Sequence, residues 1–571
     1  MGPDANRGPT VSGVGTPESD DTIATRVLAR RGDPARALLF EDSEWSWGEV
    51  VAEACTRSAV LGELRRPGPF HVGVLLDNVP EYVFWLFGAA LSGAVVVGIN
   101  PTRRGAELER DIRHTDCQVV VTDEAGATLL DGLDLGPAAG RVMVVGTEEY
   151  AATIAPHART EPPDPEARPG PDSLYLLIFT SGSTGAPKAV RMTHGRAERT
   201  ASGSAMAFSR DDILYCAMPL FHANALVANL FPATISGATV LLRRKFSATG
   251  FKEDLRRYGC TFFNYVGRAL SYILAVPEDP SDNDNDLKWI LGSEASPRDR
   301  AEFKRRFGCP VFEGYGSSEN AVIISPVPGT PKVALGKPQP GTEVAILDRE
   351  TGREKAVAEI DEHGRLLNPE DAIGEIVGRN TVGHFEGYYN NPEAEAERLR
   401  AGLYWTGDLG YVDAAGFVYF AGRTADWLRV DGENFSAGAV ERVLGRWAPA
   451  TTAVVYGVPD PVTGDQVMAA LIMAPGTGFD PSEFEAFLAS EPDLGTKWAP
   501  RFVRVAPDLP LTGVGKVDKA PLRAEAWATT DPVWWRPDRS PAYRLLGKED
   551  REELEGRFAA NGREQFLPAG A

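Results

Sequence analysis

Cysteine and histidine are scarce in this chain, and neither forms a metal-binding or disulfide pattern. The 571 residues include five cysteines, at positions 55, 117, 216, 260 and 309, with no C-x-x-C pair. An odd number of widely spaced cysteines disfavours a disulfide framework and favours a reducing compartment. The seven histidines form no H-E-x-x-H or other ligand cluster, so a zinc site is not expected.

The chain also lacks an excess of positive charge and a long hydrophobic run. Its net charge of −21 would be repelled by nucleic acids and anionic membranes, so neither is expected as a partner. One uncharged stretch that could suggest a membrane helix, Val83 to Ile99, falls short of the roughly 20 apolar residues that cross a bilayer and contains three glycines. It predicts a buried helix packed under a strand. Without a visible secretory signal or transmembrane segment, a cytoplasmic protein is expected.

The order of apolar segments predicts an α/β fold. Between residues 21 and 420, short β-rich runs alternate with amphipathic helical patterns, which is typical of parallel sheets covered by helices. Residues 343–379 predict a small β subdomain, residues 421–435 a polar connector, and the segment beyond them a compact α+β domain. The strands expected in the first part are His71–Leu76, Gln118–Thr122, Arg141–Val145, Leu174–Phe179 and Ala238–Leu242.

A loop suited to binding phosphate follows the apolar run Leu174 to Phe179. It reads Thr180-Ser181-Gly182-Ser183-Thr184-Gly185-Ala186-Pro187-Lys188. Glycines let backbone N–H groups approach an anion, the hydroxyls add donors, and Lys188 adds charge. The loop is not a Walker A motif, because Gly-Lys is not adjacent and no Ser or Thr follows the lysine. A P-loop nucleoside triphosphatase is therefore disfavoured.

Four further motifs follow the loop in a fixed order. They are Gly314-Tyr315-Gly316-Ser317-Ser318-Glu319, Tyr404-Trp405-Thr406-Gly407-Asp408, Gly422-Arg423-Thr424-Ala425-Asp426 and Thr512-Gly513-Val514-Gly515-Lys516. A histidine, His222 in the segment Pro-Leu-Phe-His-Ala-Asn, precedes these four motifs and belongs to the same set. In this order and spacing the set resembles the adenylate-forming superfamily of acyl-CoA synthetases, adenylation domains and luciferases. The chain looks most similar to the very-long-chain and fatty-acid-transport-protein branch, through residues 237–247, 431–436 and 531–546.

The resemblance implies a specific architecture. We expect an α/β fold with a large N-terminal domain of helix-covered sheets and a small β subdomain, hinged to a small mobile α+β C-terminal domain. The expected boundaries are a disordered tail at 1–20, the ATP- and acid-binding domain at 21–422, a hinge at 423–427, the C-terminal domain at 428–525 and a C-terminal extension at 526–571. Ala425 occupies the hinge position, where many relatives carry Asp or Lys.

The resemblance also implies the reaction and the residues that carry it. A carboxylate attacks the α-phosphorus of ATP, pyrophosphate leaves, and the acyl-AMP is transferred to CoA; fixed donors and cations stabilise the charge that develops. Lys516, Thr184, Glu319 and His222 are the expected catalytic residues, with Thr184 and Glu319 holding Mg²⁺. The expected ATP contacts are Thr180, Ser181, Gly182, Ser183, Gly185, Lys188, Gly292, Ser293, Glu294, Gly314, Tyr315, Gly316, Ser318, Asp408, Phe420 and Arg423.

The acid pocket and the CoA path are expected in two further groups of residues. The pocket is expected at His222, Asn224, Tyr265, Arg268 and Glu294, and the CoA path at Arg429, Gly432 and Asn434. For His222 an ordinary buried histidine stays an equal alternative. Because burying an unpaired charge is expensive, Arg268 and Glu294 predict a small polar, aromatic or steroid-like acid, unless the two pair with each other or one of them faces the nucleotide.

Two alternatives stay open beside an acyl-CoA synthetase with ATP, Mg²⁺ and CoA. One is an ATP-dependent diazotase that activates nitrite for an aryl amine, since a tight polar pocket would suit it. The other is a ligase that loads a carrier protein in trans, because no carrier domain follows Lys516. A small-molecule acid is the expected partner, and a homodimer is compatible with the sequence.

Overall fold

The computed structural model describes residues 21–568, except 159, 181–187, 268, 296, 363–365, 424–425, 431–432, 463, 492–493, 496, 514 and 538–541. The predicted tail at 1–20 lies outside the described residues. Contacts between residues group the chain into two units. The first contains residues 1–330, 337–343 and 378–404, and the second contains 331–336, 344–377 and 405–571. The hinge at 423–427 stays a prediction, because a division of the chain by contacts does not show about which residues the two units rotate.

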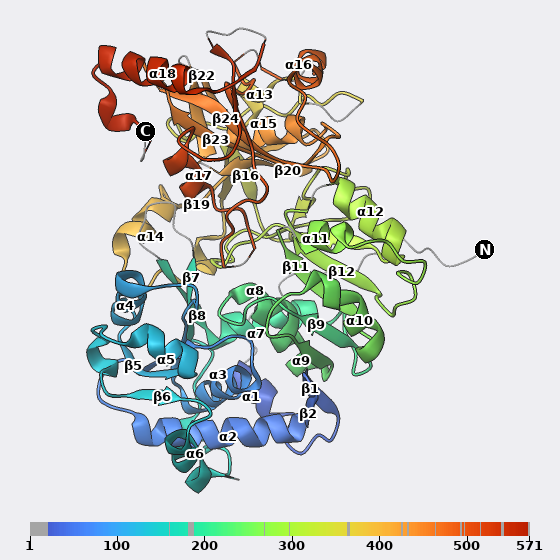
Figure 1. The fold of residues 1–571 in the computed structure, drawn as a ribbon. Helices are drawn as coiled ribbons and strands as arrows, with labels where there is room; N and C mark the ends of the chain where they lie inside the picture. Colours follow the sequence, from blue (N-terminus) through green and yellow to red (C-terminus); the bar gives the residue numbers. More distant parts are fainter. Residues whose placement is uncertain are drawn as a thin grey trace, which may run out of the picture. The chain divides into compact units, whose positions relative to one another are not determined.

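Two helix-covered sheets form the first unit, as predicted for an α/β fold (Figure 1). One sheet has the strand order β6-β5-β3-β4-β7-β8, and the other β13-β12-β11-β9-β10-β1-β2. Neighbouring strands are parallel except the antiparallel pairs β7–β8 and β1–β2. The strands are β1 Arg36–Phe40, β2 Ser43–Ser46, β3 His71–Leu75, β4 Val95–Gly98, β5 Cys117–Thr122, β6 Val142–Val144, β7 Leu174–Thr180, β8 Lys188–Thr193, β9 Ile213–Cys216, β10 Thr239–Leu242, β11 Phe262–Val266, β12 Trp289–Ser293 and β13 Val311–Glu313.

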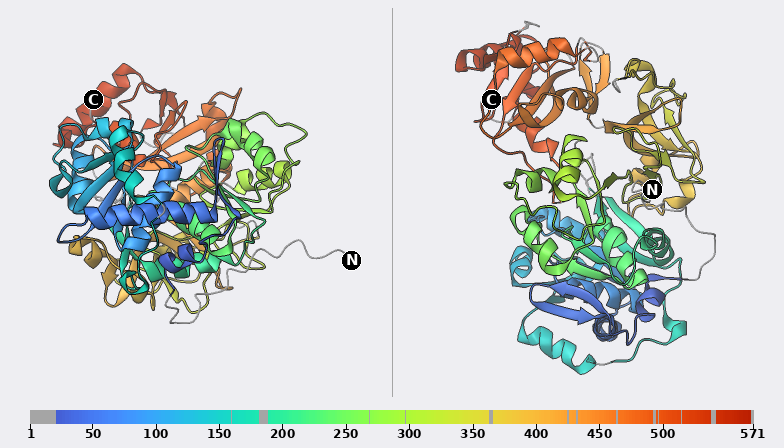
Figure 2. Two further views of the ribbon diagram at one scale, coloured as in Figure 1. Left: turned by 90° about the horizontal axis from the view of Figure 1, so that it is seen from below. Right: turned by 90° about the vertical axis from the view of Figure 1, so that its right-hand side faces the viewer.

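The uncharged stretch Val83 to Ile99 forms a buried helix and the strand that follows it, as predicted. Helix α3 (Pro80–Ser92) begins with a proline and ends at Gly93, whose φ of +70° is readily adopted by glycine. It packs on α2 (Trp47–Leu64), which lies along the outside of the unit in Figures 1 and 2. No described helix is long and apolar enough to cross a membrane.

The other helices of this unit lie on the faces and at the ends of the two sheets (Figures 1 and 2). They are α1 Ile23–Leu28, α4 Gly105–His114, α5 Glu124–Leu130, α6 Glu148–Ile154, α7 His194–Ala205, α8 Ala223–Ala225, α9 Phe231–Ser236, α10 Ala248–Tyr258, α11 Ala269–Ala275, α12 Pro297–Phe307 and α14 Pro392–Arg398. A short strand pair, β14 (Ile324–Ser325) and β15 (Lys337–Pro338), and the strand β18 (Leu399–Arg400) complete the first unit.

The second unit contains the predicted small β subdomain and the C-terminal segment. Strands β16 (Val344–Leu347), β17 (Gly374–Gly378) and β19 (Leu403–Val412) are neighbours in that order, β20 (Val418–Arg423) pairs with β19, and α13 is Pro369–Ala372. The C-terminal sheet has the order β23-β24-β25-β26-β27. Its elements are β23 Ala450–Pro459, β24 Asp465–Met473, β25 Phe502–Val505, β26 Val533–Trp535, β27 Arg544–Leu545, α15 Ala437–Leu444, α16 Pro481–Ser490, α17 Lys519–Glu525 and α18 Lys548–Ala560.

The polar connector predicted at 421–435 is wrong. Its described part is a β-hairpin of β21 (Trp427–Val430) and β22 (Glu433–Ser436), in which Leu428 and Phe435 are buried. Along the two strands these buried side chains alternate with polar ones, so one face of the hairpin is buried. The charged residues of the segment made it look like a polar connector.

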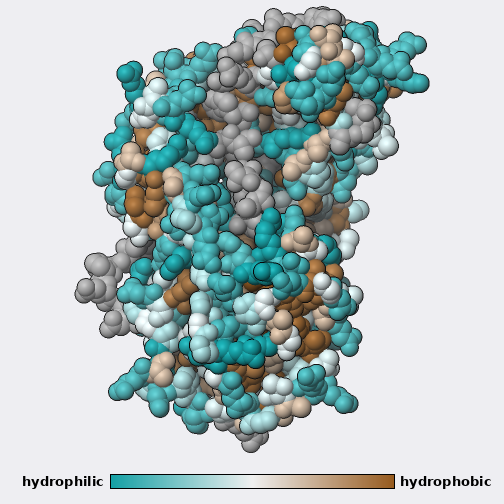
Figure 3. Space-filling view, turned by 90° about the vertical axis from the view of Figure 1, so that its left-hand side faces the viewer, coloured by the Kyte–Doolittle hydropathy of each residue, from teal (hydrophilic) through white to brown (hydrophobic). Residues whose placement is uncertain are grey.

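The segment after residue 525 shares the core of the C-terminal sheet. Trp527, Trp535 and Phe558 are buried in one cluster with Tyr456 and Phe502 of the preceding strands. On the face drawn in Figure 3 hydrophilic side chains predominate, and hydrophobic ones form small separate groups.

Candidate active site

Three of the predicted site segments meet where parallel strands of the first unit end. Strands β11, β12 and β13 lie side by side, and the backbone of Gly267 donates to Ser293 O at 3.0 Å. The N–H of Gly314 donates to Gly292 O at 3.2 Å. The carboxyl ends of parallel strands are where α/β sheets bind ligands, so these segments form a candidate pocket edge.

Tyr265 and Glu313 lie beneath this edge. A Cβ on Gly292 would come within 2.3 Å of the Tyr265 ring, so glycine is required there. The Tyr265 hydroxyl donates to Glu313 Oε1 at 3.1 Å, and the N–H of Ala295 donates to the same oxygen at 2.6 Å. Burial raises the pKa of Glu313. The sequence analysis predicted Tyr265 but missed Glu313, because nothing in a three-residue strand indicates a half-buried carboxyl group that accepts two hydrogen bonds.

Glu294 lies in the left-handed region of backbone conformation, with φ +72°. Its side chain is exposed, so Glu294 is not the buried charge from which a small polar, aromatic or steroid-like acid was predicted. An exposed carboxylate keeps its hydration, so it needs no compensating partner. Arg268 lies outside the described residues, and its pairing with Glu294 stays a prediction.

Glu319 is buried, not a solvated surface carboxylate. It is 5% exposed, and the hydroxyl of Tyr388 donates to its Oε1 at 2.7 Å. Burial and the nearby Glu319 charge raise the pKa of Tyr388, which keeps the phenol a neutral donor. Arg398 Nε donates to the Tyr388 oxygen at 3.3 Å, and Arg196 Nη2 donates to Ser318 O at 2.7 Å. The sequence analysis missed Tyr388, Arg398 and Arg196, which lie far from Glu319 in the chain.

The ends of the predicted phosphate loop lie next to this group. Residues 181–187 are outside the described residues, but Thr180 and Lys188 pair across the antiparallel strands β7 and β8. Lys188 is 5% exposed, and its Nζ lies 2.9 Å from Glu397 Oε2 and 5.6 Å from the Tyr388 ring centroid. Tyr388 therefore contacts both the lysine of the loop and the carboxylate expected to hold a metal.

Backbone pairing fixes these positions. The N–H of Tyr389 donates to Ala189 O at 2.8 Å, and that of Arg191 donates to Gly387 O at 3.1 Å, so the segment around Tyr388 lies along β8. Tyr315 and Ile324 exchange two backbone hydrogen bonds, of 2.9 and 3.0 Å. The Tyr315 side chain is half-buried, as expected of a group that stacks on a base, and Gly316 is exposed.

We expect that Tyr388→Phe lowers the rate of acyl-AMP formation by roughly tenfold, because the lost hydroxyl no longer orients Glu319. The melting temperature should fall modestly, because the buried Glu319 carboxylate loses one hydrogen-bond donor. The measurement is ATP–pyrophosphate exchange across a Mg²⁺ titration. Tyr389→Phe is the matched control, as its hydroxyl donates to Asp116 at 2.8 Å instead. Equal rates for the two variants would show that Tyr388 does not position Glu319.

His222 and Asn224 follow β9 at a close contact between segments. A Cβ on Gly98 at the end of β4 would come within 2.8 Å of Phe221 O, so glycine lets the segment approach the sheet. The His222 ring packs 4.4 Å from the Phe221 ring and both His222 and Asn224 are half-buried. A π-helical turn, Leu226–Leu230, follows them, a feature that often occurs at functional sites.

In the second unit, Asp408 and Arg423 occupy opposite positions on β19 and β20. Glu375 Oε1 accepts from the N–H of Gly407 at 2.8 Å, and Thr406 Oγ1 donates to Ile376 O at 2.7 Å. These bonds fix the turn before Asp408. Phe420, on β20, is 39% exposed. The structure thus places the residues predicted to bind ribose on adjacent strands of one sheet.

Lys516 lies at the end of a tight turn in the same unit. The N–H of Thr512 donates to Lys516 O at 2.7 Å, and that of Gly515, at φ +80°, donates to Thr512 O at 2.8 Å. Arg429 and Asn434 are opposite each other in the β21–β22 hairpin, and Gly432 at its turn is outside the described residues.

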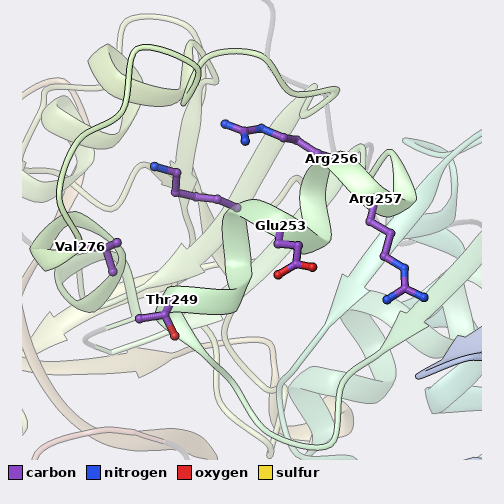
Figure 4. Close-up of a pocket in the computed structure, with 6 residues that line it drawn as sticks. Thr249, Glu253, Arg256, Arg257 and Val276 are labelled. Atoms are coloured by element: carbon purple, nitrogen blue, oxygen red, sulfur yellow. The ribbon is translucent and has the colours of Figure 1, made fainter.

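A surface hollow of about 520 Å³ lies on α10 in the first unit (Figure 4). It is lined by Thr249, Lys252, Glu253, Arg256, Arg257 and Val276. Lys252 pairs with Asp282, Arg257 with Asp42 at 2.8 Å, and Arg256 donates to Ser281 O at 3.0 Å. With these partners the cations need no ligand, and the hollow contains none of the predicted site residues.

Comparison with known proteins identifies the family. The model of the AMP-binding enzymes matches residues 25–389, and that of the AMP-binding enzyme C-terminal domain matches residues 439–516. The chain therefore belongs to the AMP-binding enzymes, the adenylate-forming superfamily predicted from its motifs.

Several relatives share most of the chain. A steroid-22-oyl-CoA synthetase of Rhodococcus jostii is 52% identical over 96% of this chain and 99% of its own length. A medium/long-chain-fatty-acid–CoA ligase of Mycobacterium marinum is 45% identical over 90% of this chain and 97% of its own. The crystal structure of an anthranilate CoA ligase in complex with anthranoyl-AMP has a TM-score of 0.77 at 23% identity, covering 89% and 98% of the two chains, which confirms the fold.

These relatives confirm the predicted activity: the chain is an ATP-dependent, AMP-forming acyl-CoA ligase. They do not favour the diazotase or the carrier-loading ligase. ATP, CoA and a small-molecule acid are thereby its substrates.

Proposed function

We propose that the acid is a steroid bearing a side-chain carboxylate. The observation that carries this proposal is the 52% identity, along nearly the whole chain, to a steroid-22-oyl-CoA synthetase. The medium/long-chain-fatty-acid–CoA ligases among the relatives are less similar, at 32–46% identity. A flat polycyclic acid would be held mainly by apolar contacts, as is usual in ligand pockets.

The test compares acids in one assay. The pure protein is incubated with Mg·ATP, CoA and either a steroid-22-oic acid or one of a series of fatty acids of about 8 to 18 carbons. The acyl-CoA and AMP that form are measured by mass spectrometry. We expect kcat/KM for the steroid acid to exceed that for every fatty acid by about tenfold, the size of a difference of 1.4 kcal/mol in transition-state binding. A fatty acid as the preferred substrate would refute the proposal.

Residue roles follow the same proposal. The loop at 180–188 would bind the β- and γ-phosphates, Tyr315 would stack on adenine, Asp408 would accept from the ribose hydroxyls, and Lys516 would contact the attacking carboxylate oxygen and the α-phosphate. The O–P bond between the α- and β-phosphates breaks as the acyl oxygen bonds to the α-phosphorus. The CoA sulfur then bonds to the acyl carbon and AMP leaves.

Glu319 and Thr184 would hold the Mg²⁺ that neutralises charge on the phosphates. Glu319 fits this part, because a carboxylate is a preferred Mg²⁺ ligand and Tyr388 orients one of its oxygens. The part of the chain that the structure describes has no group of three or more His, Cys, Asp or Glu residues that could hold a metal. That agrees with Mg²⁺ bound through few protein oxygens, phosphates and water.

We expect Glu294→Gly to shift the substrate range toward longer, more apolar acids, because it removes a charged side chain from the strand edge. Stability should not fall, since glycine adopts φ +72° without steric conflict. The measurement is kcat/KM along the chain-length series beside a thermal melt. Glu294→Ala is the control: it removes the same charge but does not have the backbone freedom of glycine, so comparing the two variants separates the effect of the charge from that of the backbone. An unchanged series in both variants would exclude Glu294 from the pocket.

A cytoplasmic location, a homodimer, the hinge at Ala425 and the CoA path through Arg429, Gly432 and Asn434 stay predictions.

A further inference from the structure

A cluster of charged side chains in the second unit joins two segments that the reaction uses. Asp426 lies near the end of the predicted hinge at 423–427, and Lys519 and Arg523 lie on α17, just after Lys516. Lys519 Nζ is 3.0 Å from Asp426 Oδ2 and 2.9 Å from Glu441 Oε1. Arg523 Nη2 donates to the other Asp426 oxygen. The side chains of Asp426 and Lys519 are 15% and 16% exposed, so solvent screens this pair little.

Each member is held by regular structure. Lys519 and Arg523 are four residues apart on α17 and so share one face of the helix. Glu441, on α15, also accepts from the N–H of Val455 at 2.8 Å, which connects the cluster to β23. Burial alone would lower the pKa of Lys519, but Glu441 and Asp426 together raise it, so its ammonium group stays charged.

The turn that carries Lys516 is connected rigidly to the start of α17. Leu511 and Val517 form an antiparallel bridge, and the N–H of Asp518 donates to Pro510 O at 2.8 Å. The Asp518 side chain caps α17 by accepting from the N–H of Ala520 at 3.0 Å. Only Val517 and Asp518 lie between Lys516 and Lys519, and both are held by backbone hydrogen bonds. A displacement of Lys519 would therefore displace Lys516.

We propose that Lys519 is a positioning residue for Lys516: through Asp426 it makes the segment leaving the hinge and the turn carrying Lys516 move as one body. This inference rests on the proposed role of Lys516. A buried ion pair contributes little net stability compared with apolar packing, whereas its directional bonds fix geometry. A displacement of about 1 Å at a reacting group can lower a rate by up to about 10²-fold, so an ion pair that holds the Lys516 turn in place matters for catalysis.

The test compares the two half-reactions in the full-length enzyme. Adenylation is measured by ATP–pyrophosphate exchange, and thioester formation from supplied acyl-AMP and CoA. In Lys519→Met we expect kcat for adenylation to fall about tenfold with little change in the KM for ATP, since binding contacts are intact. Thioester formation should stay within about twofold, because it does not use Lys516. Lys519→Arg should recover most of the loss, since it restores a cation to Asp426.

Controls separate positioning from folding. Arg544→Gln removes another ion pair of the same unit, Arg544 with Asp550 at 2.6 Å, and should leave both half-reactions unchanged. If Lys519→Met does not fold, Asp426→Asn, which keeps the side-chain shape, decides the question in the same assays. An equal loss in both half-reactions, or no loss, would overturn the inference. A wild-type enzyme without exchange activity would instead refute the proposed function.

Discussion

Lys516→Ala is expected to abolish acyl-AMP formation, lowering ATP–pyrophosphate exchange by about 10³-fold, while thioester formation from supplied acyl-AMP stays largely intact. The cause is the loss of a fixed cation where negative charge develops on the α-phosphate and the attacking oxygen. The turn around Gly515 presents this side chain, and its backbone bonds to Thr512 do not depend on the lysine head group. Alanine should therefore leave the fold unchanged.

Lys548→Ala is the matched control, because that lysine lies in the same unit, on α18, and its side chain is 89% exposed. It should leave both half-reactions at the wild-type rate. A loss of both half-reactions together in Lys516→Ala, with an unchanged melting curve, would contradict the role assigned to Lys516.

Glu319→Gln is the second substitution with a large expected effect, a loss of about 10²-fold in adenylation. Glutamine keeps an acceptor for the Tyr388 hydroxyl but removes the charge that would bind Mg²⁺. We therefore expect a higher Mg²⁺ concentration for half-maximal exchange in addition to the lower rate. The measurement is pyrophosphate exchange across a Mg²⁺ series, with a thermal melt to exclude unfolding.

Glu393→Gln, an exposed carboxylate in the first turn of α14, is the control for general loss of negative charge in the same unit. Its Mg²⁺ dependence should match the wild type. A Glu319→Gln enzyme with the wild-type rate and the wild-type Mg²⁺ dependence would show that this carboxylate does not hold the metal.

Local patterns predicted much of the fold. The β-rich runs at His71–Leu76, Gln118–Thr122 and Leu174–Phe179 form strands within one residue of their expected bounds. The reason is that β-branched and apolar runs bounded by turn residues are stable in few other arrangements. The prediction for the charged segment at 421–435 failed, because its buried apolar residues, Ala421, Leu428, Val430 and Phe435, were too few to stand out against the polar residues around them.

Contacts between distant segments could not be predicted in the same way. Tyr388 meets Glu319 because the segment around it lies along β8, and no local pattern specifies that pairing. Glu313 is half-buried because three parallel strands bring Tyr265 and Ala295 to it, and both donate to its carboxylate. Glu294 was expected to be a buried charge, yet the strand edge turns it outward at φ +72°.

The sequence by itself determined the family, the adenylating chemistry and the order of the site segments, because phosphate-binding loops and the residues around them need particular residue types at short, fixed spacings. Only the tertiary structure decided which groups orient those residues: Tyr388 for Glu319, Glu375 for the turn before Asp408, and Lys519 for the segment next to Lys516. These partners are many residues apart in sequence, and it is the packing of sheets and helices that brings them within hydrogen-bonding distance.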